Sequence, residues 1–505
     1  MGKYFGCHNH TMYSNIRLLD CIIRPKDLID KAIELGLSGI AITDHECISA
    51  AMEVNQYAKK LRETHPDFTV ALGNEVYLVD ERGSGQKYYH FILIAKDALG
   101  HKGLRELSSI AWYNSYTNRG MERVPITKDE LFNVVNKYKG HIIATTACMG
   151  GELSSNAYLM AEAEKVGDGI NSKYYYDQIK NFMQYCKSLF GDDFYIECAP
   201  SSAQDQMTVN RELYKLSQEF NVKMTVGTDA HYLRPEDRPV HKAYLNSKGG
   251  EREVDAFYEF AHLMTYEEVS NLLIPCFLDM EVPAGDIASQ ILDNSLEIQN
   301  KIEWYSLERK QIIPKVEVTD YPKVIEGWLS SHRTDYPIFC GLMLSDNVQE
   351  RYWANECYMS LLEKMYNKRI DDSKMEEYIR RLEIEADIIK DIGEKLDDCL
   401  FAYFNTFKHY IDLFWECGSI VGPGRGSATG FLSNYLLGIT QLDPIRWNLP
   451  YWRFLNKERA ELPDIDIDLA PSKRPSIFKA IRDERGEFGL IQVGTFGTEG
   501  TKSAI

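Results

Sequence analysis

Residues 3–45, KYFGCHNHTMYSNIRLLDCIIRPKDLIDKAIELGLSGIAITDH, decide the fold of the first half of this chain. The segment contains two short β-branched runs, and between them lies a stretch with helical spacing of its apolar residues. Pro25 stands where a helix can begin, and Gly36 stands where it can end. The segment therefore predicts a strand, a helix and a second strand, which is the unit of a parallel βα fold.

The same texture continues to about residue 235, where five further runs read as strands. They are FTVALGNEVYLV (68–79), YYHFILIAKD (88–97), GHIIATTAC (140–148), DFYIECAP (193–200) and KMTVGTDAHYL (223–233). Long helical stretches follow, with an irregular crossing segment predicted at 303–324, and strand and turn chemistry returns near residue 420. Repeated strands and helices predict parallel βα units, arranged as a barrel or as an open sheet.

Composition restricts the class of protein. The 505 residues carry a formal net charge of -18, which argues against a general nucleic-acid binder but leaves room for a local basic groove. The 11 cysteines form no CxxC pair and no signal peptide precedes them, so we expect a reduced, cytoplasmic protein. Apolar runs are too short for a membrane-spanning helix.

Side chains that bind metals follow or lie in the predicted strands of the first region. They are His8, His10, Asp20, His45, Glu75, His90, Cys148, Asp229 and His231, with Asp44 beside His45. Ligands in βα folds gather at the carboxyl ends of the strands, so these distant positions can converge on one mouth. Imidazoles, carboxylates and one thiol suit Zn, Mn or Fe, and a bridging carboxylate such as Glu75 could hold two metals. The alternative is that they are capped turn residues and core histidines.

The motifs CHNH, AITDHE, GNEVY, TTACMGGEL and GTDAH resemble those of the polymerase and histidinol phosphatase (PHP) domain. This resemblance implies a distorted seven-stranded βα barrel that holds up to three metals, with the same nine residues from His8 to His231 as ligands. The sequence departs from the family pattern at NIR, inserted before LLD, and at Cys21, where the family often has glycine. Both departures lie beside Asp20.

A second group of motifs lies near the end of the chain. GPGRGSATG, residues 422–430, is a glycine-rich turn that runs into an apolar helix, and such turns offer backbone N–H groups and a helix dipole to phosphate. PDIDIDL, residues 463–469, reads as a strand that turns Asp464, Asp466 and Asp468 to one face. A phosphate cradle followed by alternating aspartates is typical of nucleotidyl transfer with two Mg ions. An exposed acidic strand edge is the alternative.

The stretch VGPGRGSATGFLSNYLLGITQLDPIRWNLPYWRFLNKERAELPDIDIDL is similar to the palm of the bacterial family C replicative polymerases, the DNA polymerase III alpha subunits, and TFGTEGTKSAI resembles the segment that follows there. The resemblance implies a PHP barrel, a helix-rich connecting layer and a partial nucleotidyltransferase-like α+β palm, with boundaries at 1–240, 241–400 and 401–505. It implies these roles: Asp464 and Asp466 as catalytic Mg ligands, and Gly424, Arg425, Gly426 and Ser427 as the triphosphate site, assisted by Arg453 or Arg459.

The resemblance also implies the substrates, partners and extent of the protein. Primer-template DNA and deoxynucleoside triphosphates would be the substrates, and a sliding clamp and other replisome subunits would bind through parts outside this chain. A third catalytic aspartate, the thumb and the fingers would lie beyond residue 505, so we expect this N-terminal portion to be inactive in synthesis by itself. The PHP barrel would be either a 3′-to-5′ exonuclease or a non-catalytic structural platform.

Overall fold

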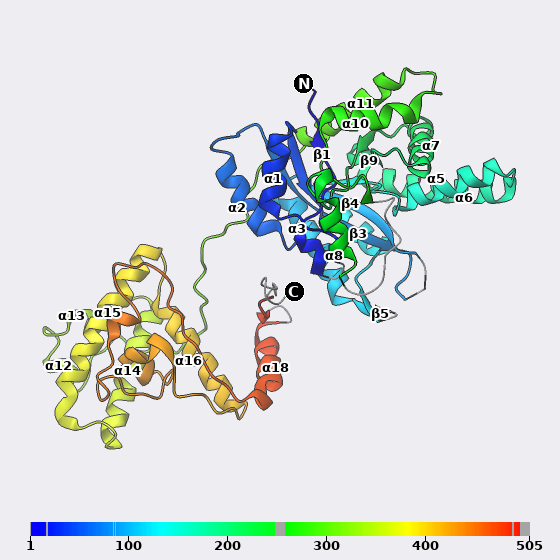
Figure 1. The fold of residues 1–505 in the computed structure, drawn as a ribbon. Helices are drawn as coiled ribbons and strands as arrows, with labels where there is room; N and C mark the ends of the chain where they lie inside the picture. The colour runs from blue at the N-terminus through cyan, green and yellow to red at the C-terminus, as the bar shows by residue number, and fades with distance from the viewer. Residues whose placement is uncertain are drawn as a thin grey trace. The chain divides into compact units, whose positions relative to one another are not determined.

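The computed structural model describes residues 2–16, 19–83, 85, 87–118, 120–247, 258–486 and 489–494. The chain forms two compact units, residues 1–309 and 310–505, which are described separately (Figure 1). The three-part division at residues 240 and 400 stays a prediction. No helix among the described residues has the length and apolar character that crossing a bilayer requires.

Unit 1 is built around one sheet whose main path has seven strands, which correspond to the seven predicted runs. In sheet order they are β1 (Phe5–Gly6), β2 (Gly39–Ile42), β3 (Thr69–Val79), β4 (Tyr89–Ala95), β8 (Ile142–Thr145), β9 (Phe194–Cys198) and β10 (Met224–Val226). A short strand, β7 (Ile126–Thr127), pairs with β3, and β5 (Tyr116–Asn118) and β6 (Met121–Arg123) form a separate hairpin. The predicted seven-stranded barrel is confirmed.

One strand runs against the prediction of uniformly parallel units. β4 pairs antiparallel with both β3 and β8, whereas the other neighbouring strands of the main path are parallel. The cause is the short connection between β3 and β4, since a parallel pair needs a crossover of about a dozen residues or more. The amino end of β4 therefore lies with the carboxyl ends of its neighbours.

The first and last strands approach each other at both ends of the barrel. Beyond their carboxyl ends, the amide of His10 donates to the carbonyl of Ala230 at 3.0 Å. At the amino ends, α11 (Ala284–Asn300) joins them: the amide of Phe5 donates to Ser295 Oγ at 3.0 Å, and Asn294 Nδ2 donates to the carbonyl of Met224 at 2.8 Å. The barrel is thereby nearly closed, and a small apolar cluster fills its interior.

Helices cover the outside of this sheet, and most of them share one continuous apolar core with it (Figure 1). In chain order they are α1 (Pro25–Glu34), α2 (Ala51–Leu61), α3 (Ala98–Tyr113), α4 (Lys128–Lys137), α5 (Glu152–Lys165), α6 (Gly169–Phe190), α7 (Gln204–Phe220), α8 (Arg238–Leu245), α10 (Tyr266–Leu273) and α11. The first begins at Pro25, and Gly36 follows its end with a φ of 77°, as predicted.

The regular secondary structure described in unit 2 is helical, and long irregular segments connect its helices. Its helices are α12 (Trp328–Ser331), α13 (Pro337–Met343), α14 (Val348–Tyr366), α15 (Met375–Leu396), α16 (Phe401–Glu416), α17 (Leu432–Leu436) and α18 (Arg474–Arg485). Residues 303–324 contain neither helix nor strand, as predicted for an irregular segment. Among the described residues of this unit, the one β-pairing is an antiparallel bridge between Val421 and Leu469.

Candidate functional site

The barrel fold brings all nine predicted side chains to one mouth. His8 and His10 follow β1, His45 follows β2, Cys148 follows β8, and Asp229 and His231 follow β10. Glu75 lies within β3 and is paired with His45 across a parallel bridge, and Asp20 lies in the loop before α1. His90 is the second residue of β4. Because β4 runs antiparallel to its neighbours, its amino end, with His90, lies at the same edge of the sheet as their carboxyl ends.

Four of these side chains surround one point. His8 Nε2 lies 2.8 Å from Glu75 Oε2 and 3.3 Å from Asp229 Oδ1. His10 Nε2 lies 3.2 Å and 3.0 Å from the same two oxygens. The four ligand atoms all lie within 4.8 Å of one another, and the four side chains are buried. Two imidazoles and two carboxylates at this spacing form a candidate metal site.

A second set shares His10 with the first. The ligand atoms of His10, His45 and His231 also lie within 4.8 Å of one another, with 3.3 Å between His45 Nε2 and His231 Nε2. Asp20 Oδ2 lies 3.3 Å from His45 Nε2, so this carboxylate belongs to the same set. Asp20 Oδ1 is buried and has no hydrogen-bond partner among the described residues, an arrangement that a bound cation would relieve.

Glu75 connects these sets to a third group. Its Oε2 faces His8 and His10, while its Oε1 lies 2.6 Å from His90 Nδ1 and 3.3 Å from His45 Nδ1. Cys148 Sγ lies 3.6 Å from His90 Nδ1. Each carboxylate oxygen thus points to different imidazoles, which is the geometry of a carboxylate that can bridge two cations.

The electrostatics of the cluster favour the binding of a cation. Burial opposes ionisation of Glu75, yet the imidazoles of His90 and His45 outweigh it and hold the pKa of Glu75 well below its usual value. Burial and the neighbouring imidazole of His10 lower the pKa of His231 to about 3, so the His231 imidazole is neutral and can donate a lone pair. Burial and the carboxylates of Asp229 and Glu75 raise the pKa of the Cys148 thiol well above its usual value, so a thiolate there needs a cation.

Two supporting residues were not predicted as part of the site. Glu197 lies within β9 and is 1% exposed; its Oε1 is 2.6 Å from His8 Nδ1. Such an outer carboxylate fixes the tautomer and orientation of a ligand histidine. His241 Nε2 lies 2.6 Å from the carbonyl oxygen of Asp20 and so fixes the loop that carries this carboxylate. The detectable signal for Glu197 was a lone acid inside the otherwise apolar strand FYIEC.

Asp44 is buried beside the cluster but is occupied elsewhere. Its Oδ1 accepts from the amide of Thr11 at 2.6 Å and from Ser14 Oγ at 2.8 Å. Ser14 Oγ in turn lies 3.2 Å from His10 Nδ1 and accepts from the amide of His45 at 3.1 Å. Asp44 therefore orients the loop around His10 and His45 and is not one of the converging side chains.

Unusual backbone conformations occur at the cluster. Asp229 has a φ of 47°, and Glu46 and Ala147, which adjoin His45 and Cys148, have φ values of 54° and 57°. Non-glycine residues rarely adopt this left-handed region, and such conformations persist where the surrounding structure imposes them, often at functional sites. The fold therefore holds strained backbone at the positions that carry or adjoin these side chains.

The glycine-rich loop and the aspartate run meet in unit 2. The amide of Gly422 donates to the carbonyl of Asp468 at 2.9 Å, beside the bridge between Val421 and Leu469. One guanidinium nitrogen of Arg425 lies 3.3 Å from Asp466 Oδ1, and its Nε lies 3.7 Å from Asp468 Oδ1. Segments about 40 residues apart in the chain thus form one surface that carries both the cradle and the acids.

The aspartate run has the predicted alternation but lies outside any strand ladder. Asp464, Asp466 and Asp468 are exposed, whereas Ile465 is 8% exposed and Ile467 packs against the core of unit 2. Only the bridge at Leu469 pairs this segment among the described residues. The predicted strand is therefore an extended segment anchored by its isoleucines.

The helix after the loop was expected to offer the positive end of its dipole to phosphate, and in the structure this end is already occupied. Residues Gly426–Gly430 form a 3-10 turn, and α17 behind it has five residues. The carboxylate of Glu385 accepts from the amides of Leu432 and Ser433 at 2.6 Å and 2.8 Å, so it occupies the amino end of α17. An anion bound at this surface could therefore accept hydrogen bonds from the loop amides and from Arg425, but not from the amino end of α17.

The loop itself has the expected backbone freedom. Gly424 and Gly426 have φ values of 105° and 66°, which favour glycine, and both flank Arg425. Ser427 is half-buried in the 3-10 turn.

The two candidate assisting arginines are placed differently. Arg453 ends a 3-10 turn, Tyr451–Arg453, that lies beside the loop: a Cβ on Gly430 would come within 2.5 Å of the carbonyl oxygen of Pro450. Arg459 Nε instead pairs with Glu461 Oε2 at 2.7 Å. Of the two, Arg453 is the one that the structure places in a turn beside the loop. The segment TFGTEGTKSAI, residues 495–505, lies outside the described residues.

Comparison with known proteins gives two family matches. Residues 6–201 match the PHP domain, and residues 356–505 match the bacterial DNA polymerase III alpha NTPase domain. Both resemblances inferred from the sequence motifs are thereby confirmed.

The chain is also similar over its length to curated polymerases. It is 38% identical over 516 residues to a DNA-directed DNA polymerase of Bacillus phage SPbeta, covering 99% of this chain. It is 30% and 27% identical to DNA polymerase III alpha subunits of Campylobacter jejuni and Aquifex aeolicus, covering 100% and 99% of this chain. The chain spans 39% of the length of each of these three relatives.

Proposed function

Since the chain belongs to the family of bacterial DNA polymerase III alpha subunits, we propose that the protein of which it is part is a DNA-directed DNA polymerase that extends a primer by two-metal nucleotidyl transfer. The observation that supports this most is the junction of loop and aspartates, in which Arg425 lies 3.3 Å from Asp466 Oδ1. Asp464 and Asp466 would hold Mg²⁺, which would neutralise the departing pyrophosphate.

Arg425 has a defined part in this proposal. In the structure it neutralises Asp466 and Asp468, whose like charges otherwise repel. When cations take the carboxylates, the guanidinium is released and can bind phosphate oxygens in a bidentate way. The amides around Gly424, Gly426 and Ser427 would hold the remaining phosphate oxygens, and Arg453 would assist from the adjacent turn.

Primer extension by the full-length protein tests this assignment. Asp464→Asn and Asp466→Asn should each lower the extension rate by at least about a hundredfold, because each removes a charge that holds the metals. Asp468→Asn is the matched control on the same segment and should retain most of the rate. Equal losses in all three variants would show that the aspartates act through folding or general charge and would overturn the assignment.

The proposal extends to location and partners. The protein would act in the cytoplasm on primer-template DNA and deoxynucleoside triphosphates. A sliding clamp and other replisome subunits would bind through segments outside this chain. A third catalytic aspartate would also come from such a segment, so synthesis is expected of the full-length protein and not of these 505 residues alone.

A second activity is favoured by the buried cluster in unit 1. We propose that it binds Zn, Mn or Fe and hydrolyses phosphodiesters, as a 3′-to-5′ exonuclease would. Bound metals would lower the pKa of a coordinated water. The nine converging side chains, and the orphaned Asp20 Oδ1 in particular, support cation binding. Glu197 and His241 would keep His8 and the Asp20 loop oriented.

This activity can be separated from a purely structural barrel. The 505-residue chain should release mononucleotides from labelled single-stranded DNA when Mn or Zn is supplied. Asp20→Asn should lower both bound metal, measured by elemental analysis, and nuclease rate, whereas His65→Ala, a histidine outside the cluster, should change neither. If purified chain carries no metal, takes up none and gives the same rate with Asp20→Asn, the barrel is a structural platform.

A further inference from the structure

A pocket opens beside the buried cluster of unit 1 and shares two side chains with it. Its volume is about 260 Å³, and Cys148 and Asp229 form part of its wall. The remaining wall comes from segments after β8, β9 and β10 and from Phe260 and Ala261. A molecule in this pocket would therefore touch the cluster at one end.

The chemistry of the pocket wall differs from that of the cluster. Met149, Pro200 and Phe260 contribute apolar surface, and Asp205 and Gln206 contribute polar atoms. No lysine or arginine is among the described residues that line it. An apolar pocket with an acidic edge disfavours phosphate and suits a flat neutral ring that carries hydrogen-bond donors.

Two hydrogen-bonded frames hold this wall in place. The carbonyl of Ala261 accepts from the amides of His231 and Tyr232 at 2.8 Å and 3.3 Å, which fixes the position of Phe260 relative to the cluster. On the opposite side, Asn210 Nδ2 donates to the carbonyl of Ala199 at 2.8 Å, and Gln206 Nε2 donates to Asn210 Oδ1 at 2.9 Å. The pocket is thus preformed, which reduces the ordering cost of binding.

We propose that this pocket binds the terminal nucleoside of the DNA strand whose phosphodiester is cleaved at the cluster, with its base against Phe260. The assignment rests on the proposed phosphoesterase activity, and it divides the substrate by chemistry: the anionic phosphate goes to the metal-binding side chains, and the neutral base and sugar go to the pocket. Asp205 and Gln206 would meet the hydrogen-bonding groups of the nucleoside.

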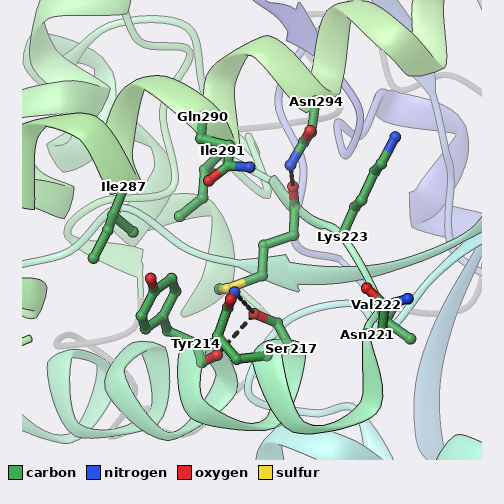
Figure 2. Close-up of a pocket in the computed structure, with 11 residues that line it drawn as sticks. Tyr214, Ser217, Asn221, Val222, Lys223, Ile287, Gln290, Ile291 and Asn294 are labelled. Carbon is green, nitrogen blue, oxygen red and sulfur yellow. Dashed lines mark hydrogen bonds between the residues drawn. The ribbon is translucent and has the colours of Figure 1, made fainter. Parts of the chain in front are cut away.

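A second pocket in unit 1 supplies a matched control. It lies between the end of α7, the start of β10 and α11, and Figure 2 shows Tyr214, Gln290 and Asn294 around it. None of its lining residues belongs to the cluster. Tyr214 and Phe260 are both aromatic, half-buried and packed against the same core, so Tyr214→Ala and Phe260→Ala remove comparable rings from different pockets.

The experiment uses two probes on the 505-residue chain. Thymidine carries no phosphate, so its binding, followed by saturation-transfer NMR on the metal-free chain, reports the pocket alone. The p-nitrophenyl ester of thymidine 5′-phosphate reports pocket and cluster together in the presence of Mn. Phe260→Ala should abolish the thymidine signal and raise KM for the ester about tenfold with kcat changed less than twofold, as expected for loss of base stacking. Tyr214→Ala should leave both measurements unchanged.

Further arms keep the outcomes distinct. Ala203→Phe fills the pocket without removing core packing and should reproduce the effects of Phe260→Ala, while Phe260→Tyr should restore binding. Hydrolysis of bis-p-nitrophenyl phosphate by the unmodified chain reports the phosphoesterase activity itself. If that ester is cleaved but thymidine does not bind and KM is unchanged in Phe260→Ala, the pocket assignment is overturned. If thymidine binds but neither ester is cleaved, the phosphoesterase proposal fails, and of the pocket assignment only nucleoside binding stands.

Discussion

Replacing Glu385 by glutamine should change how the stability of unit 2 depends on pH. Burial raises the pKa of Glu385 from 4.5 to about 7, against the opposing effect of the Ser433 and Leu432 amides that it caps. An acid whose pKa is higher in the folded chain binds more protons when folded, so its contribution to stability falls as pH rises from the lower pKa to the higher one.

The magnitude follows from the two pKa values. A pKa difference of one between the folded and unfolded chain corresponds to about 1.36 kcal/mol, so the full cost of ionising Glu385 approaches about 3 kcal/mol above pH 7. Between pH 5 and pH 8 the loss attributable to Glu385 is about 2 to 3 kcal/mol. Glutamine does not ionise, and its amide leaves one of the two capped N–H groups unpaired, which costs about 1–3 kcal/mol at every pH.

Urea unfolding at pH 5, 6, 7 and 8 measures the difference between the two proteins. Tryptophan fluorescence follows the unfolding of unit 2 when Trp112 and Trp304 of unit 1 are replaced by phenylalanine, because Trp353 is fully buried in the core of unit 2. The stability advantage of the original chain over Glu385→Gln should shrink by about 2 to 3 kcal/mol from pH 5 to pH 8. Glu383→Gln is the control, because Glu383 on the same helix caps the amides of Ile338 and Phe339 at a partly exposed position. A difference that stays constant within about 0.5 kcal/mol refutes the reasoning.

Three further predictions concern the barrel. Glu197→Gln should weaken Mn binding about 10- to 100-fold, measured by titration calorimetry, because it removes the carboxylate 2.6 Å from His8 Nδ1; unchanged affinity would contradict this role. Gly227→Ala should lower the unfolding free energy by about 1–3 kcal/mol, since its Cβ would come within 2.1 Å of Glu197 Oε1, and thermal unfolding with Gly285→Ala, which meets no atom within 4 Å, checks it. Metal at about 100 times its Kd should raise the unfolding free energy of unit 1 by about 2.7 kcal/mol, and a chelator should reverse this rise. An unfolding free energy that metal does not change would show that the cluster binds none.

The sequence located the strands of the barrel because each is a short apolar run between polar turns. The direction of each strand was harder to predict from the sequence. For β4 the only indication of an antiparallel pairing with β3 is the short connection between the two strands. His90 does lie beside Glu75 and Cys148, but the sequence argument placed it there by the rule that ligands gather at the carboxyl ends of strands, whereas His90 lies near the amino end of the reversed strand β4. The roles of all nine residues stay predictions until metal binding is measured.

Supporting contacts between distant residues were beyond the reach of the sequence. Glu197 meets His8 across 189 positions, and His241 meets the loop of Asp20 across 221. No spacing rule connects such pairs, because the barrel alone brings them together. Glu385 is a similar case: a glutamate on an amphipathic helix normally faces solvent, and its burial at the end of α17 depends on the packing of unit 2.

The two candidate metal sites differ in burial, and this difference suits different chemistry. In unit 1 eight of the nine converging side chains are buried, so a metal there would replace most of its hydration by protein ligands and would be held as a resident ion. In unit 2 the aspartates are exposed and Arg425, itself 59% exposed, compensates their charge. Few protein ligands and an open face fit Mg²⁺, which keeps waters and binds together with substrate phosphates. The same chain thus provides a preassembled site that suits the proposed hydrolysis and an open surface that would be completed by the nucleotide in the proposed transfer.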